Sequence, residues 1–368
     1  MREWAENIWQ KLEKKLEYTV RNTDERVFAY TTKNGKFVND FDVSWWTNGF
    51  WPGILWLMYS ETQNPLYRER AEILEKELEK PLYEFEKIDH DVGFMYLLSS
   101  VANYRLTGNN ESKRKGLLAS SLLASRYNDA GKFIRAWNGK HVTGYAIIDC
   151  MMNIPLLYWA SRELCDPRFE FIAKNHADTV LKTFIRDDGS VNHINCFNAE
   201  TGEFIETLKG QGYEVGSSWT RGQAWAIYGF VLSYIYTKQQ KYLDAAKKVA
   251  HYFIASLSAK DDFVPDCDFR APKEPLYKDT TAGVIAACGL IEISKCVGTY
   301  EKDMYLNSAF KILKETEMRY ANWSNDEASI IQMGTQAYDT GQNMPIIYGD
   351  YFFIEAILKL KGTKILLW

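Results

Sequence analysis

The amino-acid sequence predicts an all-α fold, an (α/α)6 barrel in which helical hairpins form one closed ring. Apolar residues recur at helical spacing along most of the 368 residues. The alternating runs typical of half-buried strands are few and short. The helical segments also alternate between nearly apolar and amphipathic ones, a pattern typical of a buried inner layer and a solvent-facing outer layer.

About twelve helical segments are expected, which would pair along the chain into about six hairpins. Their expected ranges are 1–19, 48–61, 65–86, 91–106, 112–128, 144–163, 167–185, 217–237, 240–257, 279–298, 301–321 and 348–361. Long loops are expected at 187–216 and 261–275. We place no domain boundary and expect residues 1–368 to form a single domain.

A flat solenoid of helical repeats is the alternative architecture. The expected repeats are spaced irregularly, from about 40 to 75 residues, unlike the fixed period of a short-repeat array. The sequence therefore favours the closed barrel.

The composition favours a sugar ligand over nucleic acid. The chain has 12 Trp, 23 Tyr and 19 Phe, more aromatic residues than a core alone requires. Their rings can stack on the apolar faces of sugars. A net charge of −4 argues against binding a nucleic-acid backbone. The amphipathic N-terminal segment does not resemble an export signal, and no apolar stretch approaches the length of a membrane span.

The cysteines and histidines predict a cytoplasmic protein without a metal site. The six cysteines lack CxxC spacing and mostly lie in apolar segments, as buried free thiols do in a reducing compartment. The five histidines lie far apart and form no ligand-pair motif. We expect a monomer or a weak homo-oligomer.

Short clusters of polar, glycine and aromatic residues precede the apolar helices. They begin at Ser44, Asp89, Thr143, Ser217, Asp279 and Tyr348. Because the inner helices of such a barrel run in the same direction, these clusters should converge on one mouth, which is the candidate site.

Two aspartates in these clusters are the candidate catalytic groups. Asp149 is expected one to two turns inside the apolar helix 144–163, where a carboxyl is costly unless it is paired or protonated. A protonated carboxyl suits a general acid, although a structural hydrogen bond to a loop is the alternative. Asp91 is expected near a helix N-terminus, where an acid also serves as a cap. Two carboxyls at one mouth are typical of glycoside chemistry.

Arg221, Trp219 and Trp225 form a second candidate group. Arg221 and Trp225 are four residues apart, hence on one helical face. A guanidinium can bind a sugar carboxylate through two hydrogen bonds, while indole rings stack on the pyranose. A structural cation–π contact or salt bridge is the alternative. His193 and Gln211 lie on the preceding loop, from which they could reach the mouth.

Taken together, these motifs resemble glycoside hydrolase family 88, the unsaturated glucuronyl hydrolases. WTNGFWPGILWL, HDVGF, IIDCMMNIPLL, SSWTRGQAWAIYGF and VIAACGLIEI occur in the family's order, and GDYFFIEAILKL follows near the end. The resemblance implies an (α/α)6 barrel, with Asp149 as the catalytic acid/base and Asp91 as a second essential aspartate. The substrate-binding positions that it implies are Trp46, His90, Trp137, His193, Gln211, Trp219, Arg221 and Trp225.

The reaction implied by the resemblance is hydration of the C4=C5 double bond of an unsaturated uronic acid. Asp149 would protonate C4 and activate the water that adds at C5. Asp91 would hold ring hydroxyls and orient Asp149, while Arg221 and Gln211 would face the carboxylate. The implied partner is a small glycosaminoglycan oligosaccharide made by polysaccharide lyases. Neither a metal nor an organic cofactor is needed.

One loop departs from the family pattern. Some members carry residues that accept a sulfate group in the segment from Gly334 to Tyr348, but this chain has no Lys or Arg there. We therefore do not expect a strong sulfate preference, and Lys209 is the candidate contributor from another loop.

Three other functions remain as alternatives. An unsaturated rhamnogalacturonyl hydrolase would act on pectin fragments with the same chemistry. An N-acylglucosamine 2-epimerase-like isomerase would need pairs of acid/base histidines. A non-catalytic sugar-binding protein would need only the aromatic clusters.

Overall fold

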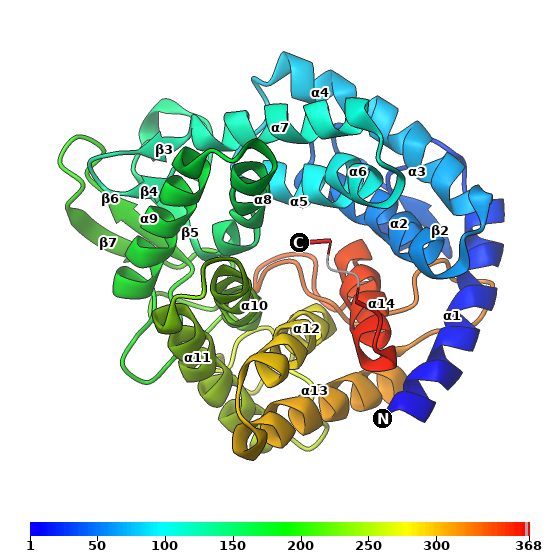
Figure 1. Ribbon diagram of the computed structural model, residues 1–368. Coiled ribbons are helices and arrows are strands. Elements are labelled where there is room, and N and C mark those ends of the chain that lie inside the picture. The colour runs from blue at the N-terminus through cyan, green and yellow to red at the C-terminus, as the bar shows by residue number, and fades with distance from the viewer. Residues whose placement is uncertain (365–366) are drawn as a thin grey trace.

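The helices form a closed ring of two layers (Figure 1). The computed structural model describes residues 1–364 and 367–368. The inner helices are α2 (Phe50–Thr62), α5 (Val92–Tyr96) with α6 (Ala102–Thr107), α8 (Pro155–Leu164), α10 (Thr220–Thr237), α12 (Thr280–Cys296) and α14 (Ile347–Lys361). The outer helices are α1 (Arg2–Asn22), α3 (Pro65–Glu77), α4 (Glu79–Glu84), α7 (Asn110–Ala124), α9 (Pro167–Thr183), α11 (Gln240–Ser258) and α13 (Thr299–Tyr320).

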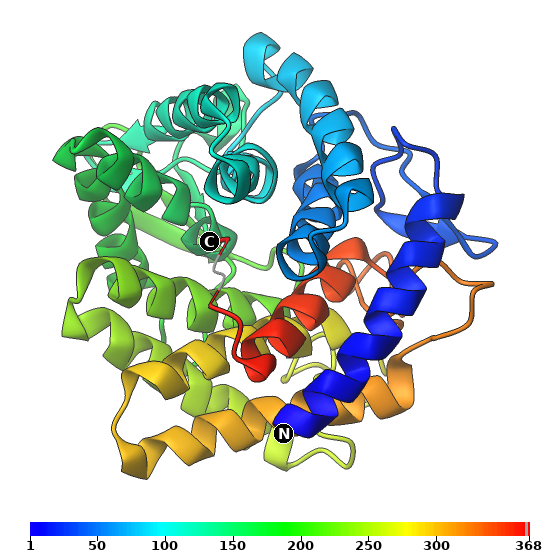
Figure 2. The same ribbon diagram turned by 45° about the vertical axis from the view of Figure 1, so that its right-hand side comes forward.

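The last inner helix closes the ring. α14 packs against α12 on one side and α2 on the other. α1 lies outside α14, beside α13, where Trp4 and Phe310 make an edge-to-face contact (Figure 2). This arrangement confirms the predicted (α/α)6 barrel.

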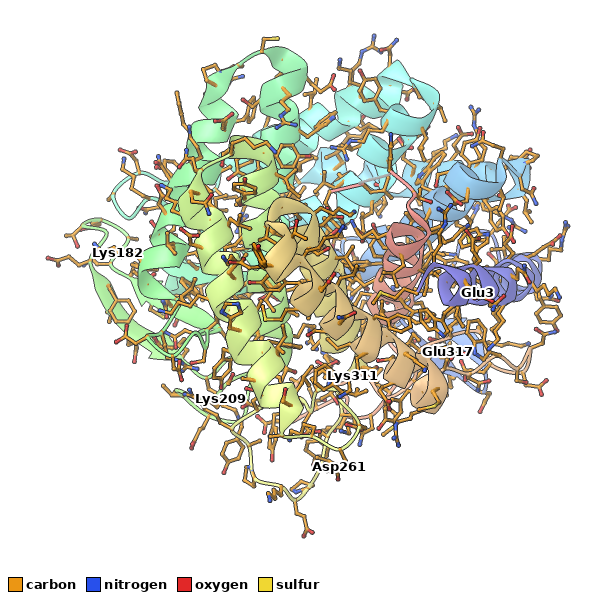
Figure 3. All side chains as sticks on the ribbon, turned by 60° about the horizontal axis from the view of Figure 1, so that its bottom comes forward. Glu3, Lys182, Lys209, Asp261, Lys311 and Glu317 are labelled. Carbon is orange, nitrogen blue, oxygen red and sulfur yellow. The ribbon has the colours of Figure 1, made fainter. Side chains whose placement is uncertain are left out.

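The burial of the helices confirms the two predicted layers. In α10 every residue from Thr220 to Ser233 is buried, as expected for a helix that is apolar on all faces. α11 buries one stripe, on which Tyr242, Ala246 and Val249 are spaced three or four residues apart. Charged side chains such as Glu3 on α1 and Lys182 on α9 are exposed at the periphery (Figure 3).

Three small antiparallel sheets lie in the connections between helices. They are β1 (Thr31–Lys33) with β2 (Lys36–Val38), β3 (Tyr127–Asn128) with β4 (Phe133–Ile134), and β5 (Tyr145–Ile147), β6 (Ile194–Phe197) and β7 (Phe204–Leu208) in the order β5-β6-β7. The expected loop 187–216 therefore contains two strands.

The prediction of a continuous helix over 144–163 was wrong in its first half. β5 is followed by a 3₁₀ turn, η4 (Ile148–Met152), and α8 begins at Pro155. The β-branched Ile147 and Ile148 favour an extended backbone, and β6 supplies the pairing partner, with Ile147 opposite Ile194. Pro155 suits the first helical position because its missing N–H has no helical partner there. Asp149 therefore lies on η4 rather than inside a helix.

Two other predicted helices are interrupted. α3 ends at Glu77, because the ring of Pro81 would clash with the Glu77 carbonyl in a continuous helix. The segment predicted as 91–106 consists of α5, a π-helical stretch, η2 (Leu97–Val101), and α6. Two further 3₁₀ turns are η1 (Trp46–Gly49) and η3 (Lys140–Val142).

Trp368 lies in the centre of the ring, against aromatic rings of α5, α10 and α14. Its ring is fully buried and stacks on Phe352 at a centroid distance of 5.6 Å. Its indole Nε1 donates to Glu355 Oε2 at 3.0 Å. The buried Lys359 lies 3.2 Å from Glu355 and 2.5 Å from Glu292. The centre therefore combines aromatic packing with charges that are paired.

The six cysteines are free, as predicted. In the part of the chain that the structure describes, no helix is long and apolar enough to cross a membrane.

We predict that Trp368→Ala destabilises the fold by about 3–5 kcal/mol, because it leaves a cavity in a packed core and leaves Glu355 without an indole donor. Denaturant unfolding followed by circular dichroism measures this change. Tyr300→Ala serves as the control, since Tyr300 is fully exposed. An unfolding midpoint of Trp368→Ala that matches the control would contradict the prediction.

Candidate active site

A cavity of about 620 Å³ opens at the N-terminal ends of the inner helices. Its lining residues are Phe41, Asp42, Ser44, Trp45, Trp46, Lys87, Asp89, His90, Asp91, Trp137, Ile147, Asp149, His193, Ile194, Gly210 and Gln211. The structure thus brings together seven of the predicted site residues: Asp91, Asp149, Trp46, His90, Trp137, His193 and Gln211. Of the six clusters expected to converge on one mouth, those that begin at Ser44, Asp89 and Thr143 contribute residues to this lining.

The two candidate catalytic aspartates lie on neighbouring segments of the cavity wall. Asp91 is the N-cap residue of α5, and Asp149 lies on η4. Asn153 bridges these segments, because its Nδ2 lies 3.2 Å from Asp91 Oδ1 and 3.4 Å from the Asp149 carbonyl oxygen. Burial, together with the negative charges of Asp89 and Asp149, raises the pKa of Asp91 well above its ordinary value. Asp91 therefore retains its proton to a higher pH than an isolated aspartate does.

Strand pairing places His193 beside Asp149. Ile147 pairs with Ile194, and the Ile148 N–H donates to the His193 carbonyl at 3.0 Å. His193 Nε2 then lies 3.3 Å from Asp149 Oδ2. The pairing of β5 with β6 thus brings together two residues that are 44 positions apart in the sequence.

The protonation of His193 follows from its other contact. The backbone N–H of Gln211 donates to His193 Nδ1 at 2.8 Å. Because a backbone N–H can only donate, Nδ1 is the acceptor, and Nε2 carries the hydrogen that faces Asp149. The ring packs on Trp219 at 4.1 Å. Gly210 is required beside it, since a Cβ there would lie 1.9 Å from His193 Nδ1.

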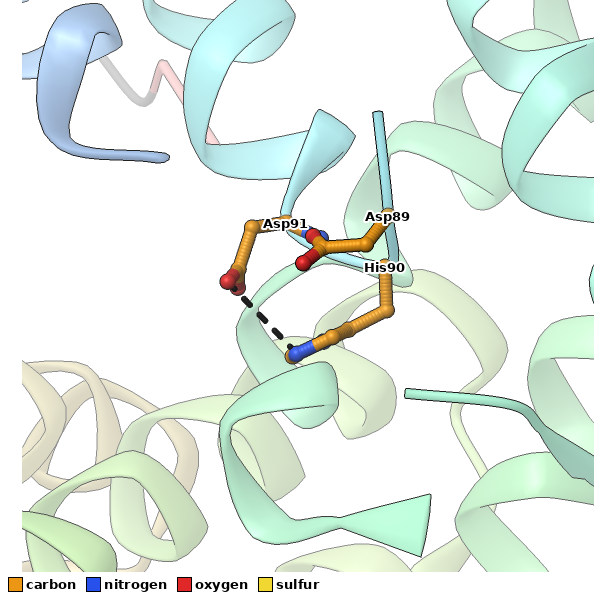
Figure 4. A group of neighbouring side chains, drawn as sticks. All are labelled: Asp89, His90 and Asp91. Carbon is orange, nitrogen blue, oxygen red and sulfur yellow. Dashed lines mark hydrogen bonds and ion pairs between the residues drawn. The ribbon is translucent and has the colours of Figure 1, made fainter. Parts of the chain in front are cut away.

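His90 lies under the carboxylate of Asp91. Its Nε2 is 3.5 Å from Asp91 Oδ2 (Figure 4). Burial lowers the pKa of His90 to about 3, so its ring is neutral at physiological pH. Neither ring nitrogen, nor Asp149 Oδ2, has a hydrogen-bond partner among the described residues. Buried polar atoms are normally paired, so these atoms are available to a ligand.

The loop before α5 also has a geometry that could hold a cation. Donor atoms of Asp89, His90 and Asp91 lie within 4.8 Å of one another. The positive charge of Arg126 already acts on Asp89 and Asp91.

Aromatic rings form the walls of the cavity. Trp46 packs on Tyr348 at 5.3 Å, and Trp137 packs on His90 at 6.3 Å. Nearer the surface, Phe41 and Trp45 stack at 4.0 Å with an interplanar angle of 11°. Such walls offer flat apolar surfaces to a pyranose ring.

Arg221 lies behind the cavity lining, whereas the sequence predicted direct contact with a sugar carboxylate. Its guanidinium is 1% exposed, pairs with Asp279 at 2.8 Å, and donates to the carbonyl oxygens of Thr335 and Gln336. Its remaining contact is with Gln211 Oε1 at 3.3 Å. Arg221 therefore acts on the cavity by holding Gln211. The sequence could not reveal Asp279 as its partner, because α10 and α12 become neighbours only in the ring.

The indoles of Trp219 and Trp225 are also away from the lining. Trp219 supports the His193 ring and lies under the Arg221 guanidinium at 4.5 Å. Trp225 is fully buried between Phe94 and Phe352. In this structure both shape the cavity from behind.

Sequence reasoning missed Asn153, although its position carried a signal. It follows Asp149 by four residues, so an amide on the same side as the candidate acid could have been inferred. Its contact with Asp91 could not, because that contact depends on how η4 packs against α5.

A carboxyl pair between aromatic walls, at the mouth of an (α/α)6 barrel, defines the class as glycoside hydrolases. The chain belongs to Glycosyl Hydrolase Family 88, whose family model matches residues 18–260.

Similar proteins cover most of the chain. An unsaturated glucuronyl hydrolase of Bacillus sp. strain GL1 is 36% identical over 86% of this chain and 86% of its own length. An unsaturated chondroitin disaccharide hydrolase of Streptococcus pyogenes serotype M1 is 33% identical over 96% of this chain and 91% of its own. The solved unsaturated glucuronyl hydrolase of Streptococcus agalactiae has a TM-score of 0.93 at 29% identity, covering 100% of this chain and 94% of that one.

We predict that Asp91→Asn makes the fold less sensitive to pH. An acid whose pKa is raised on folding contributes stability below the unfolded-state pKa, about 3.9 for aspartate, and this contribution is lost as the pH rises toward the folded-state pKa. Asparagine does not titrate, so the stability of the variant does not fall in this way as the pH rises. The variant should therefore gain thermal stability relative to the wild type at about pH 7 but not at about pH 4. Thermal unfolding across this range measures the difference, and parallel curves for the two proteins would contradict it.

Proposed function

We propose that this enzyme hydrates the C4=C5 double bond of the unsaturated uronic acid at the non-reducing end of glycosaminoglycan oligosaccharides made by polysaccharide lyases. The observation that carries the proposal is Asp149, whose Oδ2 faces His193 Nε2 at 3.3 Å and has no hydrogen-bond partner among the described residues, in an aromatic-walled cavity beside a second carboxyl. The names of the similar proteins support this substrate class.

The chemistry follows from the electron-rich double bond of an enol ether. Asp149 donates a proton to C4, and positive charge develops at C5 and the ring oxygen. A water molecule adds at C5 and returns a proton to Asp149. The product is a hemiketal, which opens and releases the remaining sugar together with a keto acid.

The neighbouring groups have distinct roles in this reaction. The Nε2–H of His193 faces Asp149 and stabilises its ionised form after proton transfer. Asp91 and His90 are placed to bind ring hydroxyls. Gln211, held by Arg221, is placed to donate its amide to the uronate carboxylate.

The rim of the cavity favours substrates without sulfate. Lys209, which precedes Gly210 and Gln211 of the cavity lining, forms an ion pair at 2.5 Å with Asp339, on the segment from Gly334 to Tyr348 that has no Lys or Arg. The carboxylate of Asp339 offsets the charge of Lys209 and would repel a sulfate group.

The alternative functions have less support. An epimerase would need a pair of acid/base histidines, but burial lowers the pKa of His90, one of the two histidines that line the cavity, to about 3. An unsaturated rhamnogalacturonyl hydrolase would share the carboxyl pair, so its substrate must be tested directly.

A panel of unsaturated disaccharides tests the substrate class. We predict turnover of unsulfated chondroitin and hyaluronan disaccharides, with kcat/KM at least about tenfold above that of sulfated ones, on the scale of one unfavourable charge contact. Loss of the ultraviolet absorbance of the conjugated enol ether measures the rate. Faster turnover of the unsaturated rhamnogalacturonan disaccharide would contradict the proposal and show that the enzyme acts on pectin fragments instead.

Replacing the acid tests the mechanism. We predict that Asp149→Asn lowers kcat at least about a hundredfold, the scale of a general acid's contribution, while binding of the disaccharide is largely kept. Single-turnover rates and calorimetric titration measure the two quantities. Unchanged turnover would remove Asp149 from its assigned role.

A further inference from the structure

Asn153 is held rigidly between the two segments that carry the catalytic carboxyls. It is fully buried. Its N–H donates to the Cys150 carbonyl of η4 at 2.9 Å, and its carbonyl accepts from Leu156 of α8 at 3.1 Å. α5 packs closely against it, since a Cβ on Gly93 would lie 2.5 Å from the Asn153 Cα. The backbone of Asn153 is therefore held between η4, α8 and α5.

The orientation of its amide follows from its partners. Asn153 Oδ1 accepts from the Phe94 N–H at 2.7 Å. A backbone N–H can only donate, so the atom facing it must be the oxygen. The amide NH₂ group must then face Asp91 Oδ1 at 3.2 Å and the Asp149 carbonyl at 3.4 Å, and both of these are acceptors.

We propose that Asn153 is a positioning residue of the hydration reaction, which ties the Asp91 carboxylate to the segment that carries Asp149 and so fixes the relative placement of the two carboxyls. This inference rests on the proposed function, because it assigns a role relative to the acid of that reaction.

The charges around Asp91 explain why a donor is needed there. Asp89 and His90 lie on its own loop, Asp149 faces it from η4, and Arg126 faces it from the end of α7. Burial and the two neighbouring aspartates favour the protonated form of Asp91, while Arg126 and the Asn153 amide favour the ionised form.

Loss of this donor would favour the protonated form of Asp91 and would release its side chain from the segment that carries Asp149. Fewer molecules would then hold the two carboxyls in the arrangement that the reaction requires. The rate of chemistry would fall, whereas the aromatic walls that bind the sugar would be unchanged.

Asn153→Asp separates this role from a purely structural one. The substitution keeps an oxygen acceptor for the Phe94 N–H, so it keeps the contact with α5. It replaces the amide NH₂ group, which donates, by a second carboxylate oxygen. This oxygen would face Asp91 Oδ1 and the Asp149 carbonyl oxygen, which also accept. A residue that only held α5 in place would tolerate this change, but a positioning residue would not.

A matched control is available in Asn103→Asp. Asn103 is also buried, and its Nδ2 donates to Glu75 Oε2 at 2.7 Å between α6 and α3. The same chemical change there introduces the same repulsion between oxygens at a position outside the cavity lining.

We expect Asn153→Asp to lower kcat about 10- to 100-fold with KM changed less than about threefold, as for loss of a hydrogen bond to a charged group. The limb of the pH profile of kcat/KM that reports Asp91 should move to higher pH, because the Asn153 amide favours the ionised form of Asp91. Asn103→Asp should lower the unfolding temperature but leave both the pH profile and kcat unchanged.

The assays use an unsulfated unsaturated chondroitin disaccharide. A wild-type pH profile retained in Asn153→Asp, or a loss of kcat matched by Asn103→Asp, would overturn the role of Asn153. If the wild-type enzyme itself did not turn over the disaccharide, the proposed function would fail instead, so the two failures are distinguishable.

Discussion

The closed ring of inner helices is the constraint on which the rest of the structure depends. α14 must pack against both α12 and α2, and the space that the ring encloses is filled by large rings, including Trp368 and Phe352. A closed ring of helices that run in one direction has all its N-termini at one end. The polar residues that precede each helix therefore meet there, although they come from segments far apart in the sequence.

Burial in this ring makes every charge costly unless it is paired. Deep in the structure the charges are paired, as Arg221 is with Asp279 and Lys359 is with Glu292. At the mouth, Asp149 Oδ2 lies 3.3 Å from His193 Nε2, but neither this oxygen nor the two nitrogens of His90 have a hydrogen-bond partner among the described residues. These atoms line the cavity, where a ligand can reach them.

The irregular elements have functional consequences. Had 144–163 formed the helix that its apolar residues predicted, Asp149 would have been separated from the loop of His193. Instead β5 pairs with β6, and the turn η4 directs Asp149 toward the histidine that follows from that pairing. Asn153, at the end of the same turn, then reaches Asp91.

The sequence by itself determined the class of fold and the residues of the carboxyl pair. Helical periodicity and the alternation of apolar and amphipathic segments are local properties, and the motifs around Asp91 and Asp149 are contiguous. Only the tertiary structure decided which side chains reach the cavity. The charge and spacing of Arg221 suit a substrate carboxylate, but in the folded protein its guanidinium pairs with Asp279, the N-cap residue of α12. The strand at Tyr145–Ile147 likewise depends on a partner about fifty residues away. Such contacts depend on which segments the closed ring brings together, which no local pattern of residues encodes.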